Sequence, residues 1–529
     1  MYNTFTGKIY DGLKMLLFSR KAMIISGIVC AIPFVFEKAF LLSYIMYIPL
    51  FCCFFNATKQ YNKRILSVFL FGFVYYAVGY SWLCELYPMD FAGLSKMEAV
   101  GVIVFAMTAV PAIHSALFTV SFAFCKRMTR DAGDVIKIAV FPCIFVFAEF
   151  LQTLGPLGFP WCRISIAQGE FLPALQSASL FGSYFITYVV LLVNALFGYA
   201  IVNPKFAKRT AVLAVAVFGI NTSYGIIRLS LFNYSSDTFT AIALQGNLSS
   251  SDKWSGSVSD MVDIYLHLAD DALAEADLRN LPKETVVLVP ETAFPVIFNQ
   301  KSPYSKTISE YAKNNEINFA VGAFSSVDKT TGNSVFLFDE EGVMSQPYSK
   351  RVLVPFGEYI PYRKLFTSLV PALADINMLS SDLLAGEGTA VFETSAGKLG
   401  TAICYESIFP NLCRESVKDG AEVLMIATND SWFGESAALK HHLAAARMRA
   451  IENGVPVIRA ANTGISALIN ADGSYKATLG VSQRGFVVGE LAEARGKTLY
   501  YYVGDSIIWV CFALTVFDKI KAFAKRIFK

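Results

Sequence analysis

Long apolar runs dominate the first 230 positions of the chain and return once near its end. They cover residues 22–36, 39–55, 65–84, 99–125, 138–154, 177–201, 210–229 and 500–517. A helix needs about 20 apolar residues to cross ~30 Å of hydrocarbon, so the pattern predicts an α-helical polytopic membrane domain of about eight spans. The first two runs are short, and they form either two crossings or one shallow hairpin.

From residue 236 onward the pattern changes to short strands that alternate with amphipathic helices. We expect strands over residues 239–244, 285–289, 319–324, 335–338, 390–394, 399–404, 423–427, 457–461 and 465–469, and helices over 257–278, 304–314, 409–418 and 439–453. This order predicts an α/β sandwich. The expected domains are a seven-span membrane domain (1–235), the α/β domain (236–496), and a last span with a basic tail (497–529).

The composition agrees with a membrane protein that carries one globular domain. Hydrophobic residues make up 54% of the 529 positions and charged residues only 16%, with a mean hydropathy of +0.47. Such a chain is too apolar for an ordinary soluble enzyme. The net charge of +3 is too small to indicate a nucleic-acid partner.

Lysine and arginine gather in alternate loops. They are Lys8, Lys14, Arg20, Lys21, Lys59, Lys63, Arg64, Lys126, Arg127, Arg130, Lys137, Lys205, Lys208, Arg209, Lys519, Lys521, Lys525, Arg526 and Lys529. Cytoplasmic loops carry an excess of positive charge, so we expect both termini in the cytoplasm and residues 236–496 outside it. The first apolar run leads directly into Glu37-Lys38 without a small-residue cleavage site, so we expect no cleavable signal peptide.

The cysteines favour membrane packing over a disulfide framework. Eight of the ten lie in or beside apolar runs, where cysteine behaves as a small hydrophobe. Cys404 and Cys413 belong to the outer domain, where an oxidising compartment permits a bridge. We expect none, because Cys404 ends a strand whereas Cys413 lies on the following helix and points elsewhere.

Three segments of the outer domain present reactive side chains. They are Val-Leu-Val-Pro-Glu291, Lys350 at the start of Lys-Arg-Val-Leu-Val-Pro-Phe-Gly-Glu358, and Thr-Ala-Ile-Cys404. Open sheets place their sites at the carboxyl ends of strands. A thiol, a carboxylate and an ammonium delivered in this way predict a cysteine nucleophile with a base and a cationic helper. By itself, Cys404 would more often be an inert buried cysteine.

Each of these residues has an expected role. The helix after Cys404 and a neighbouring ammonium would lower the pKa of its thiol. Lys350 would stabilise negative charge on an acyl intermediate, and Glu358 would hold Lys350 or a substrate amine. The plainer alternatives are a surface lysine and an ordinary loop carboxylate.

The four histidines give little support for a metal site. His114 and His267 are expected to be packing or surface residues, while His441 and His442 open a helix and lack the Cys or Asp companions of a zinc site. We expect neither metal nor cofactor. A Cys-His mechanism through His442 is a weaker alternative.

Residues 360–388 have few regular signals but many apolar side chains, namely Leu365, Phe366, Leu369, Val370, Leu373, Ile376, Met378 and Leu379. Long irregular loops near a site are often functional. We interpret this segment as a lid that dips into the lipid surface; the alternative is a poorly packed insertion.

Several motifs together resemble one known group of proteins. They are Gly158-Phe159-Pro160-Trp161, Gln245-Gly246-Asn247 with Trp254, Pro290-Glu291-Thr292, Val354-Pro355-Phe356-Gly357-Glu358-Tyr359, Ile403-Cys404-Tyr405-Glu406, Asn429-Asp430-Ser431-Trp432-Phe433-Gly434, Ala446-Arg447-Met448-Arg449-Ala450-Ile451-Glu452 and Asn462-Thr463-Gly464. Through them the chain resembles the carbon–nitrogen hydrolase (nitrilase) superfamily and, over essentially its whole length, the bacterial apolipoprotein N-acyltransferases.

The resemblance implies a Glu-Lys-Cys site on an αββα sandwich, carried by eight spans on the periplasmic side of the bacterial inner membrane. It makes Glu291 the general base, Lys350 the oxyanion-side cation and Cys404 the nucleophile. The residues that it implies as lining or supporting the site are Glu358, Tyr405, Glu406, Trp254 and Trp432. The chain departs from the family pattern at Val352, where a His is usual, and at Ser165-Ile166, where Gly-Tyr is usual.

The implied reaction moves an acyl chain from a phospholipid donor, through a Cys thioester, to the α-amine of a diacylglyceryl-modified apolipoprotein. Both substrates live in the bilayer, and a lid would restrict water. One alternative is a membrane-tethered amidase or nitrilase with water as acceptor. A second is a degenerate scaffold in a transporter-like protein, for which Glu149 is the one clear intramembrane charge.

Overall fold

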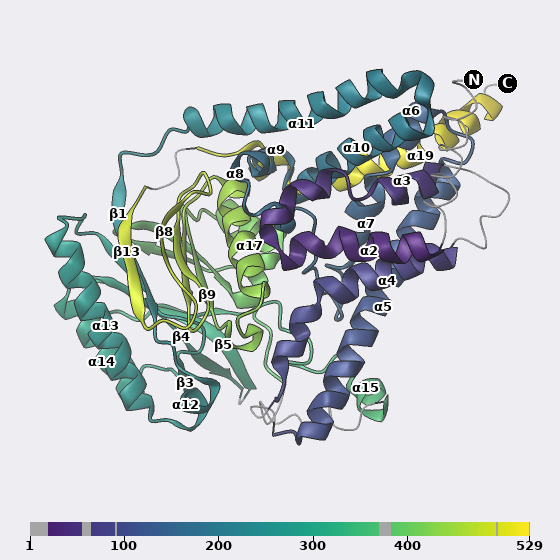
Figure 1. Ribbon diagram of the computed structural model, residues 1–529. Helices are drawn as coiled ribbons and strands as arrows, with labels where there is room; N and C mark the ends of the chain where they lie inside the picture. The colour runs from purple at the N-terminus through teal and green to yellow at the C-terminus, as the bar shows by residue number, and fades with distance from the viewer. Residues whose placement is uncertain are drawn as a thin grey trace. The chain divides into compact units, whose positions relative to one another are not determined.

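The computed structural model describes residues 20–55, 65–89, 93–328, 330–369, 382–492 and 496–527. The chain forms two compact units, one of residues 1–83, 104–230 and 505–529, the other of residues 84–103 and 231–504 (Figure 1). The predicted domain bounds at 235 and 496 stay a prediction. Basic and apolar residues of the sequence analysis that lie outside the described residues are Lys8, Lys14, Lys59, Lys63, Arg64, Lys529, Val370, Leu373, Ile376, Met378 and Leu379.

The first unit is helical. Its longer helices are α2 (Arg20–Val35), α3 (Ile48–Phe55), α4 (Ile65–Gly79), α5 (Lys96–Met128), α6 (Asp134–Val140), α7 (Cys143–Leu151), α10 (Ser183–Val202), α11 (Ala207–Ser230) and α19 (Ile507–Ile527). Shorter pieces are η1 (Glu37–Tyr44), η3 (Ser81–Leu86), η5 (Ile166–Gln168), α8 (Leu172–Leu175), α9 (Ala178–Phe181) and η6 (Pro204–Phe206). Helix α5 is divided between the two units: residues 96–103 belong to the second unit and the rest of the helix to the first.

Four helical stretches among the described residues are long and apolar enough to cross a membrane. They are Glu37–Phe55, Lys96–Met128, Ser183–Val202 and Pro204–Ser230, and Ile65–Gly79 is apolar but shorter. The count of eight spans therefore stays a prediction. The run expected to begin at residue 500 is divided into α18 (Leu499–Val503) and α19, because Gly504 adopts a φ of 55° that ends the first helix.

The helix of the second apolar run is interrupted between η1 and α3. A side chain of α10 makes hydrogen bonds to backbone groups at this interruption. Asn194 Oδ1 accepts a hydrogen bond from the Tyr47 amide at 2.9 Å, and Asn194 Nδ2 donates to the Ser43 carbonyl oxygen at 2.8 Å. Backbone polar groups at membrane depth must be satisfied inside the protein. A broken helix is therefore compatible with lipid at this position.

Glu149 on α7 has a structural role. Its Oε1 accepts the Ile164 amide at 2.9 Å, and its Oε2 accepts the Thr187 hydroxyl at 2.9 Å. The carboxylate is buried, with 1% of the residue exposed, and it ties the segment after α7 to α10. The transporter-like alternative depended on Glu149 as an intramembrane charge, and these bonds explain that charge structurally.

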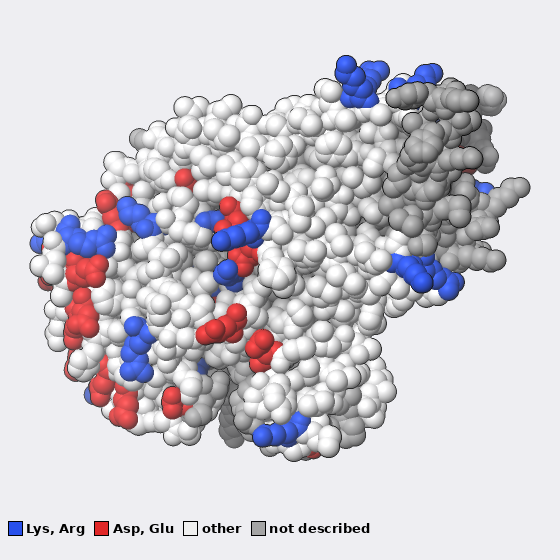
Figure 2. Space-filling view, in the orientation of Figure 1, with Lys and Arg blue, Asp and Glu red and all other residues white. Residues whose placement is uncertain are grey.

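The surface of α11 is apolar along most of its length, and Figure 2 shows it nearly free of charge there. Outward-facing Val212, Val215 and Ile220 have 60%, 61% and 70% of their surface exposed. Large exposed apolar surfaces mark sites that contact lipid or another protein. Together with the long apolar helices, this surface indicates an integral membrane protein.

The second unit contains two sheets. The first has the order β13-β1-β2-β4-β5-β6, with β3 beside β4, and the second has the order β12-β11-β10-β9-β8-β7. The strands are β1 (Thr238–Gln245), β2 (Thr285–Leu288), β3 (Phe294–Ile297), β4 (Asn318–Val327), β5 (Thr330–Phe338), β6 (Tyr348–Ser349), β7 (Val391–Thr394), β8 (Gly397–Ile403), β9 (Val423–Thr428), β10 (Val457–Ala461), β11 (Ser466–Ile469), β12 (Tyr475–Leu479) and β13 (Gly485–Ala492).

Helices α13 (Val258–Leu278) and α14 (Pro303–Asn314) cover one sheet, and α16 (Pro410–Lys418) and α17 (Ala438–Asn453) cover the other, which gives a four-layer α-β-β-α sandwich (Figure 1). Shorter helical segments of the unit are α12 (Ser250–Ser255), α15 (Arg363–Leu369), η8 (Cys404–Ile408) and η9 (Ser431–Phe433). Side chains of β1 alternate, so that Ile242 and Leu244 pack in one core with α13 and α14, while Ala241 and Ala243 pack against the second sheet. The predicted αββα sandwich is confirmed.

The expectation that the strands end at residue 469 is wrong. Two more strands follow, and β13 pairs antiparallel with β1 over eight residues, from Thr238↔Ala492 to Gln245↔Gly485. The intervening β12 is an edge strand whose residues alternate between half-buried and exposed. Its weak apolar pattern explains why the sequence did not reveal it.

Parallel pairing brings the carboxyl ends of several strands to one edge of each sheet. In the first sheet β1, β2 and β4 are parallel, and in the second β8, β9 and β10 are parallel. Segments that follow these strands are therefore the places for reactive side chains. Cys404 lies in the core between the sheets and Cys413 in the core on the outer face, so both are free cysteines as expected.

Candidate functional site

Glu291 lies on the turn that follows β2, and its carboxylate accepts three hydrogen bonds from within the protein. Its Oε1 accepts Lys350 Nζ at 2.9 Å and Asn333 Nδ2 at 2.7 Å, and its Oε2 accepts the Asn429 amide at 2.8 Å. Burial raises the pKa of Glu291, but Lys350, Lys253 and the Asn333 hydrogen bond together outweigh burial, and the pKa lies below its ordinary value. The carboxylate is therefore charged.

The turn at Glu291 packs unusually closely against β4. A Cβ on Gly322 would lie 2.2 Å from the Pro290 carbonyl oxygen and 2.8 Å from Glu291 Cα. Thr292 adopts a φ of 43°, a conformation that β-branched residues rarely take. Backbone strain of this kind is typical of functional sites.

Lys350 is held between two carboxylates. Its Nζ donates to Glu291 Oε1 at 2.9 Å and to Glu358 Oε1 at 3.0 Å, and only 1% of the residue is exposed. Burial lowers the pKa of Lys350, yet Glu291 and Glu358 outweigh that effect, so the pKa lies well above its usual range. The expected role of Glu358 in holding Lys350 agrees with this geometry.

Cys404 follows β8 and is the first residue of η8. It adopts a φ of 50° and has 7% of its surface exposed. Burial and then Glu291 raise the pKa of its thiol, and Lys350 lowers it only in part, so the pKa lies well above the ordinary value. The expectation of a lowered pKa is therefore wrong, because loss of solvation outweighs the ammonium and the short helix.

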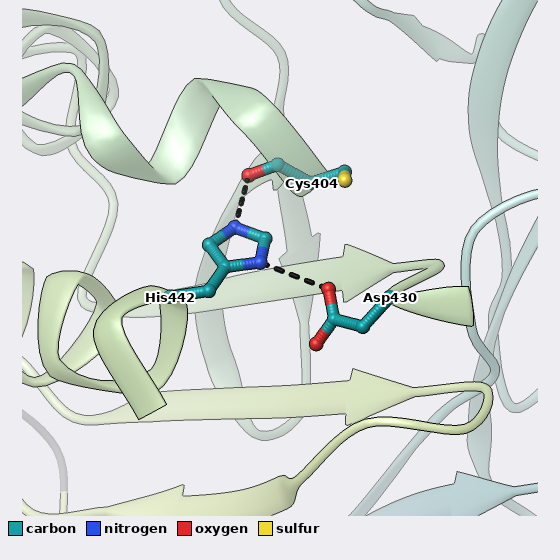
Figure 3. A group of neighbouring side chains, drawn as sticks. All are labelled: Cys404, Asp430 and His442. Atoms are coloured by element: carbon teal, nitrogen blue, oxygen red, sulfur yellow. Dashed lines mark hydrogen bonds and ion pairs between the residues drawn. The ribbon is translucent and has the colours of Figure 1, made fainter. Parts of the chain in front are cut away.

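His442 contacts the backbone of Cys404, and its ring lies between Cys404 and Asp430 (Figure 3). His442 Nε2 lies 3.0 Å from the Cys404 carbonyl oxygen, and Nδ1 lies 2.9 Å from Asp430 Oδ1. Arg459 Nη2 donates to Asp430 Oδ2 at 2.6 Å. The sulfur points away from the ring in Figure 3, so the arrangement favours support of the backbone over a Cys-His pair.

The expectation that His442 lacks metal-binding companions is wrong. Ligand atoms of Cys404, Asp430 and His442 all lie within 4.8 Å of one another. Asp430 already has a buried arginine on one oxygen and the histidine on the other, and a guanidinium beside a cation site opposes cation binding. The donor set therefore fits a hydrogen-bonded relay better than a metal centre.

Glu406 links the Cys404 segment to the Lys350 segment. Its Oε2 accepts the Ile403 amide at 2.7 Å and the Tyr348 hydroxyl at 2.9 Å, and its Oε1 accepts the Arg351 amide at 2.6 Å. Burial raises the pKa of Glu406, although these bonds act in the opposite direction. Glu406 is thus a supporting residue.

The remaining residues expected at the site have less specific positions. Tyr405 is buried, and its ring meets Phe409 edge-on with centroids 5.2 Å apart. Trp254 on α12 is 42% exposed, with its ring centroid 6.3 Å from that of Phe324. Trp432 is half-buried in η9.

Only part of the predicted lid can be described. Helix α15 covers Arg363–Leu369, and within it Phe366 is buried against Phe356. Leu365 and Leu369 are 55% and 61% exposed. These two leucines carry the apolar outer surface that the lid interpretation requires, and the lid itself stays a prediction.

Sequence reasoning missed Arg459, which bonds Asp430, and Lys253 on α12. Lys253 Nζ donates to the Glu291 carbonyl oxygen at 3.1 Å and to Thr292 Oγ1 at 2.5 Å. Burial lowers the pKa of Lys253 to about 8. Its position directly before Trp254 was the one available signal, and a single lysine in a polar helix does not stand out.

Two family models match the chain. The description "Carbon-nitrogen hydrolase" matches residues 262–500, and "Apolipoprotein N-acyltransferase N-terminal domain" matches residues 26–196. The two matches fall on different parts of the chain, one on each side of residue 230.

Among curated proteins, the chain is similar to apolipoprotein N-acyltransferases. It is 29% identical to that of Geobacter metallireducens over 95% of both chains, and 31% identical to that of Bradyrhizobium diazoefficiens over 78% of both. Among solved structures, a carbon-nitrogen hydrolase from Helicobacter pylori is 18% identical, with a TM-score of 0.38, over 52% of this chain and 94% of that one.

We predict that Gly322→Ala destabilises the α/β unit. The new methyl group would overlap Pro290 and Glu291, and overpacking of this kind costs about 1–3 kcal/mol. Thermal unfolding in detergent should show a lower Tm than wild type. Gly219→Ala is the control, because a Cβ there meets nothing within 4 Å; equal Tm values for wild type and Gly322→Ala would contradict the close approach.

We also predict that the group of Cys404, Asp430 and His442 retains no stoichiometric metal. Protein purified after exposure to Zn²⁺ and passed through a desalting column should contain well below one zinc per chain by elemental mass spectrometry. The reason is that the atoms that would bind a metal already have partners: Arg459 and His442 bond the Asp430 carboxylate, and both ring nitrogens of His442 lie in hydrogen bonds. One zinc per chain, lost in His442→Ala, would refute the relay interpretation.

Proposed function

The chain belongs to the apolipoprotein N-acyltransferase family, and we propose that Cys404, Glu291 and Lys350 carry out the acyl transfer. The enzyme is an N-acyltransferase with a carbon–nitrogen hydrolase domain. The observation that carries the assignment of residues is the buried Lys350 ammonium, shared at 2.9 and 3.0 Å by two carboxylates, with the Cys404 thiol close enough for its pKa to respond to Glu291 and Lys350.

In the first half of the reaction, Glu291 takes the thiol proton while Cys404 Sγ attacks the ester carbonyl of a membrane phospholipid. The carbon–sulfur bond forms, and Lys350 stabilises the oxyanion. The ester carbon–oxygen bond then breaks, and the proton on Glu291 passes to the departing lysophospholipid oxygen. The product of this half is a thioester on Cys404.

The raised pKa of the Cys404 thiol fits this order of events. A buried thiol of high pKa stays protonated in the resting enzyme. Attack on the carbonyl moves the negative charge from sulfur to oxygen, where the positive charge of Lys350 stabilises it. The thiol therefore becomes reactive only when a substrate carbonyl is present to take up the negative charge.

In the second half, the α-amine of an N-terminal diacylglyceryl-cysteine attacks the thioester carbonyl. An amide bond forms, the carbon–sulfur bond breaks, and the amine proton returns through Glu291 to the Cys404 sulfur. The product is an N-acylated apolipoprotein. Water would give a free fatty acid by the same route, so exclusion of water decides between transfer and hydrolysis.

Supporting residues fix these groups rather than react. Glu358 holds Lys350, and Glu406 ties the Lys350 segment to the end of β8. Trp254, Trp432 and Tyr405 lie on segments next to the site, and we assign them to substrate contact. The phospholipid donor, the apolipoprotein acceptor and the bilayer are the partners of this proposal.

We further propose that eight spans anchor the enzyme in the inner membrane, with both termini cytoplasmic and the α/β unit periplasmic. The distribution of Lys and Arg between loops supports this topology, as do the four long apolar helices of the described residues. Residues 1–235 and 497–529 would then form the membrane domain, and residues 236–496 the periplasmic catalytic domain.

A mass spectrum of the intact protein tests the nucleophile. After exposure to phospholipid, wild type should carry one acyl adduct, which Cys404→Ala abolishes because the attacking sulfur is gone. Cys413→Ala, also a buried free cysteine, should keep the adduct. An adduct that persists in Cys404→Ala would rule out the assignment. When a diacylated lipopeptide is added to acylated wild type, the acyl group should move to the peptide and give an N-acylated product. Release of the acyl group only as free fatty acid would indicate a hydrolase.

Labelling of single cysteines tests the topology. In a Cys84→Ser background, which removes an exposed cysteine, Leu278→Cys should react with a membrane-impermeant maleimide in cells with a permeabilised outer membrane, because 84% of Leu278 is exposed. Lys205→Cys, in an exposed cytoplasmic loop by this proposal, should react only after lysis. The reverse pattern would place the α/β unit in the cytosol.

A further inference from the structure

Lys253 is a second ammonium buried in the site, and neither the Glu-Lys-Cys set nor the reaction above makes use of it. It lies on α12, and only 2% of the residue is exposed. Its Nζ donates to the Glu291 carbonyl oxygen at 3.1 Å and to Thr292 Oγ1 at 2.5 Å. These bonds attach α12 to the turn that presents the proposed base.

The bond to Thr292 acts on a strained part of the backbone. Thr292 has a φ of 43°, which is unfavourable for a β-branched side chain and persists only where its surroundings hold it. Lys253 bonds both residues of the turn, one through the carbonyl oxygen and the other through the hydroxyl. Loss of the ammonium would therefore remove two bonds that hold the backbone turn from which the Glu291 side chain projects.

The charges of the site give Lys253 a second role. Glu291 and Glu358 are both paired with the one ammonium of Lys350, so these three groups together carry one negative charge in excess. A buried excess charge is costly, and it opposes further negative charge on the Cys404 sulfur. The ammonium of Lys253 brings the four groups to neutrality.

The other charged groups nearby do not supply this positive charge. Arg459 is paired with Asp430 at 2.6 Å, and His442 also faces that carboxylate. Glu406 is held by backbone amides of Ile403 and Arg351. Among the residues that the structure describes, Lys253 is thus the cation bonded to the Glu291–Thr292 turn and not to a carboxylate.

We propose that Lys253 is a positioning residue of the acyl transfer: its charged ammonium fixes the Glu291–Thr292 turn and balances the second carboxylate while negative charge passes through Cys404 to the oxyanion. This inference rests on the proposed function of Glu291 and Cys404. Lys253 acts through Glu291 and the electrostatic field of the site, and it forms no bond to substrate.

The titration of Lys253 predicts how the reaction rate should depend on pH if Lys253 has this role. Burial lowers its pKa to about 8; Glu291 and Cys404 act to raise it, and Lys350 lowers it further. The group is charged below about pH 8 and loses its charge as the pH rises through that value. Because the charged form is the supporting one, the rate of the first half-reaction should fall above about pH 8.

The experiment measures the rate of acyl-enzyme formation on full-length protein in detergent, with phosphatidylglycerol as donor, from pH 6 to 10. The head group of this lipid has no amine, and only the first half-reaction is followed, so neither donor nor acceptor contributes an amine that titrates in this range. Wild type should lose rate above about pH 8. Lys253→Met should be about 10²-fold slower at pH 7, the size of losing one fixed charge or donor in such a site, with no loss of rate near pH 8.

Lys253→Arg separates charge from shape. Arginine stays charged throughout this range, so this variant should keep more rate than Lys253→Met and should not lose rate near pH 8. Lys398→Met, at a half-exposed lysine on β8, is the control and should match wild type. Tm values for all variants identify any that fail to fold. If Lys253→Met does not fold, the pH profile of Lys253→Arg decides whether the charge of Lys253 supports the reaction.

Each outcome has a defined meaning. Equal rates and equal pH profiles for wild type and Lys253→Met would overturn the inference, as would a Lys253→Arg profile that still falls at pH 8. Absence of any adduct on Cys404 in wild type would instead contradict the proposed function. The two failures are therefore distinguishable.

Discussion

The shared ion pair of Lys350 is the interaction on which the geometry of the site depends. A fully buried ammonium needs compensating partners, and removing one partner of a buried ion pair costs about 3–5 kcal/mol. Glu291 comes from the turn after β2 and Glu358 from the loop after β6, so pairing at 2.9 and 3.0 Å fixes segments far apart in the sequence. The same carboxylate of Glu291 also accepts the Asn429 amide after β9, which connects the two sheets.

Much of this arrangement could be predicted from the sequence because it follows from apolar patterns. Most strands and helices of the sandwich lie within a few residues of their expected bounds, since the strands are apolar runs buried on one or both faces and most helices have a buried apolar face. Glu291 and Cys404 were visible because a charged or nucleophilic group just after a largely buried strand is seldom an ordinary surface residue.

The rest depends on contacts between segments that no local pattern marks. Lys253 looks like a solvated lysine until α12 packs on the Glu291 turn. Asp430 and His442 become a relay only when β9 and α17 meet. The thiol pKa of Cys404 was expected to fall because the sequence displays the helix and the ammonium, whereas burial, which raises it, is a property of the folded chain.

The most direct test of the account is an experimental structure of the enzyme trapped as its acyl-enzyme. The account predicts a thioester on Cys404 whose carbonyl oxygen lies within hydrogen-bond distance of Lys350 Nζ, with Glu291 still bonded to that ammonium. An acyl group on another residue, or a thioester carbonyl directed away from Lys350, would contradict the assignment of this buried ion pair to acyl transfer.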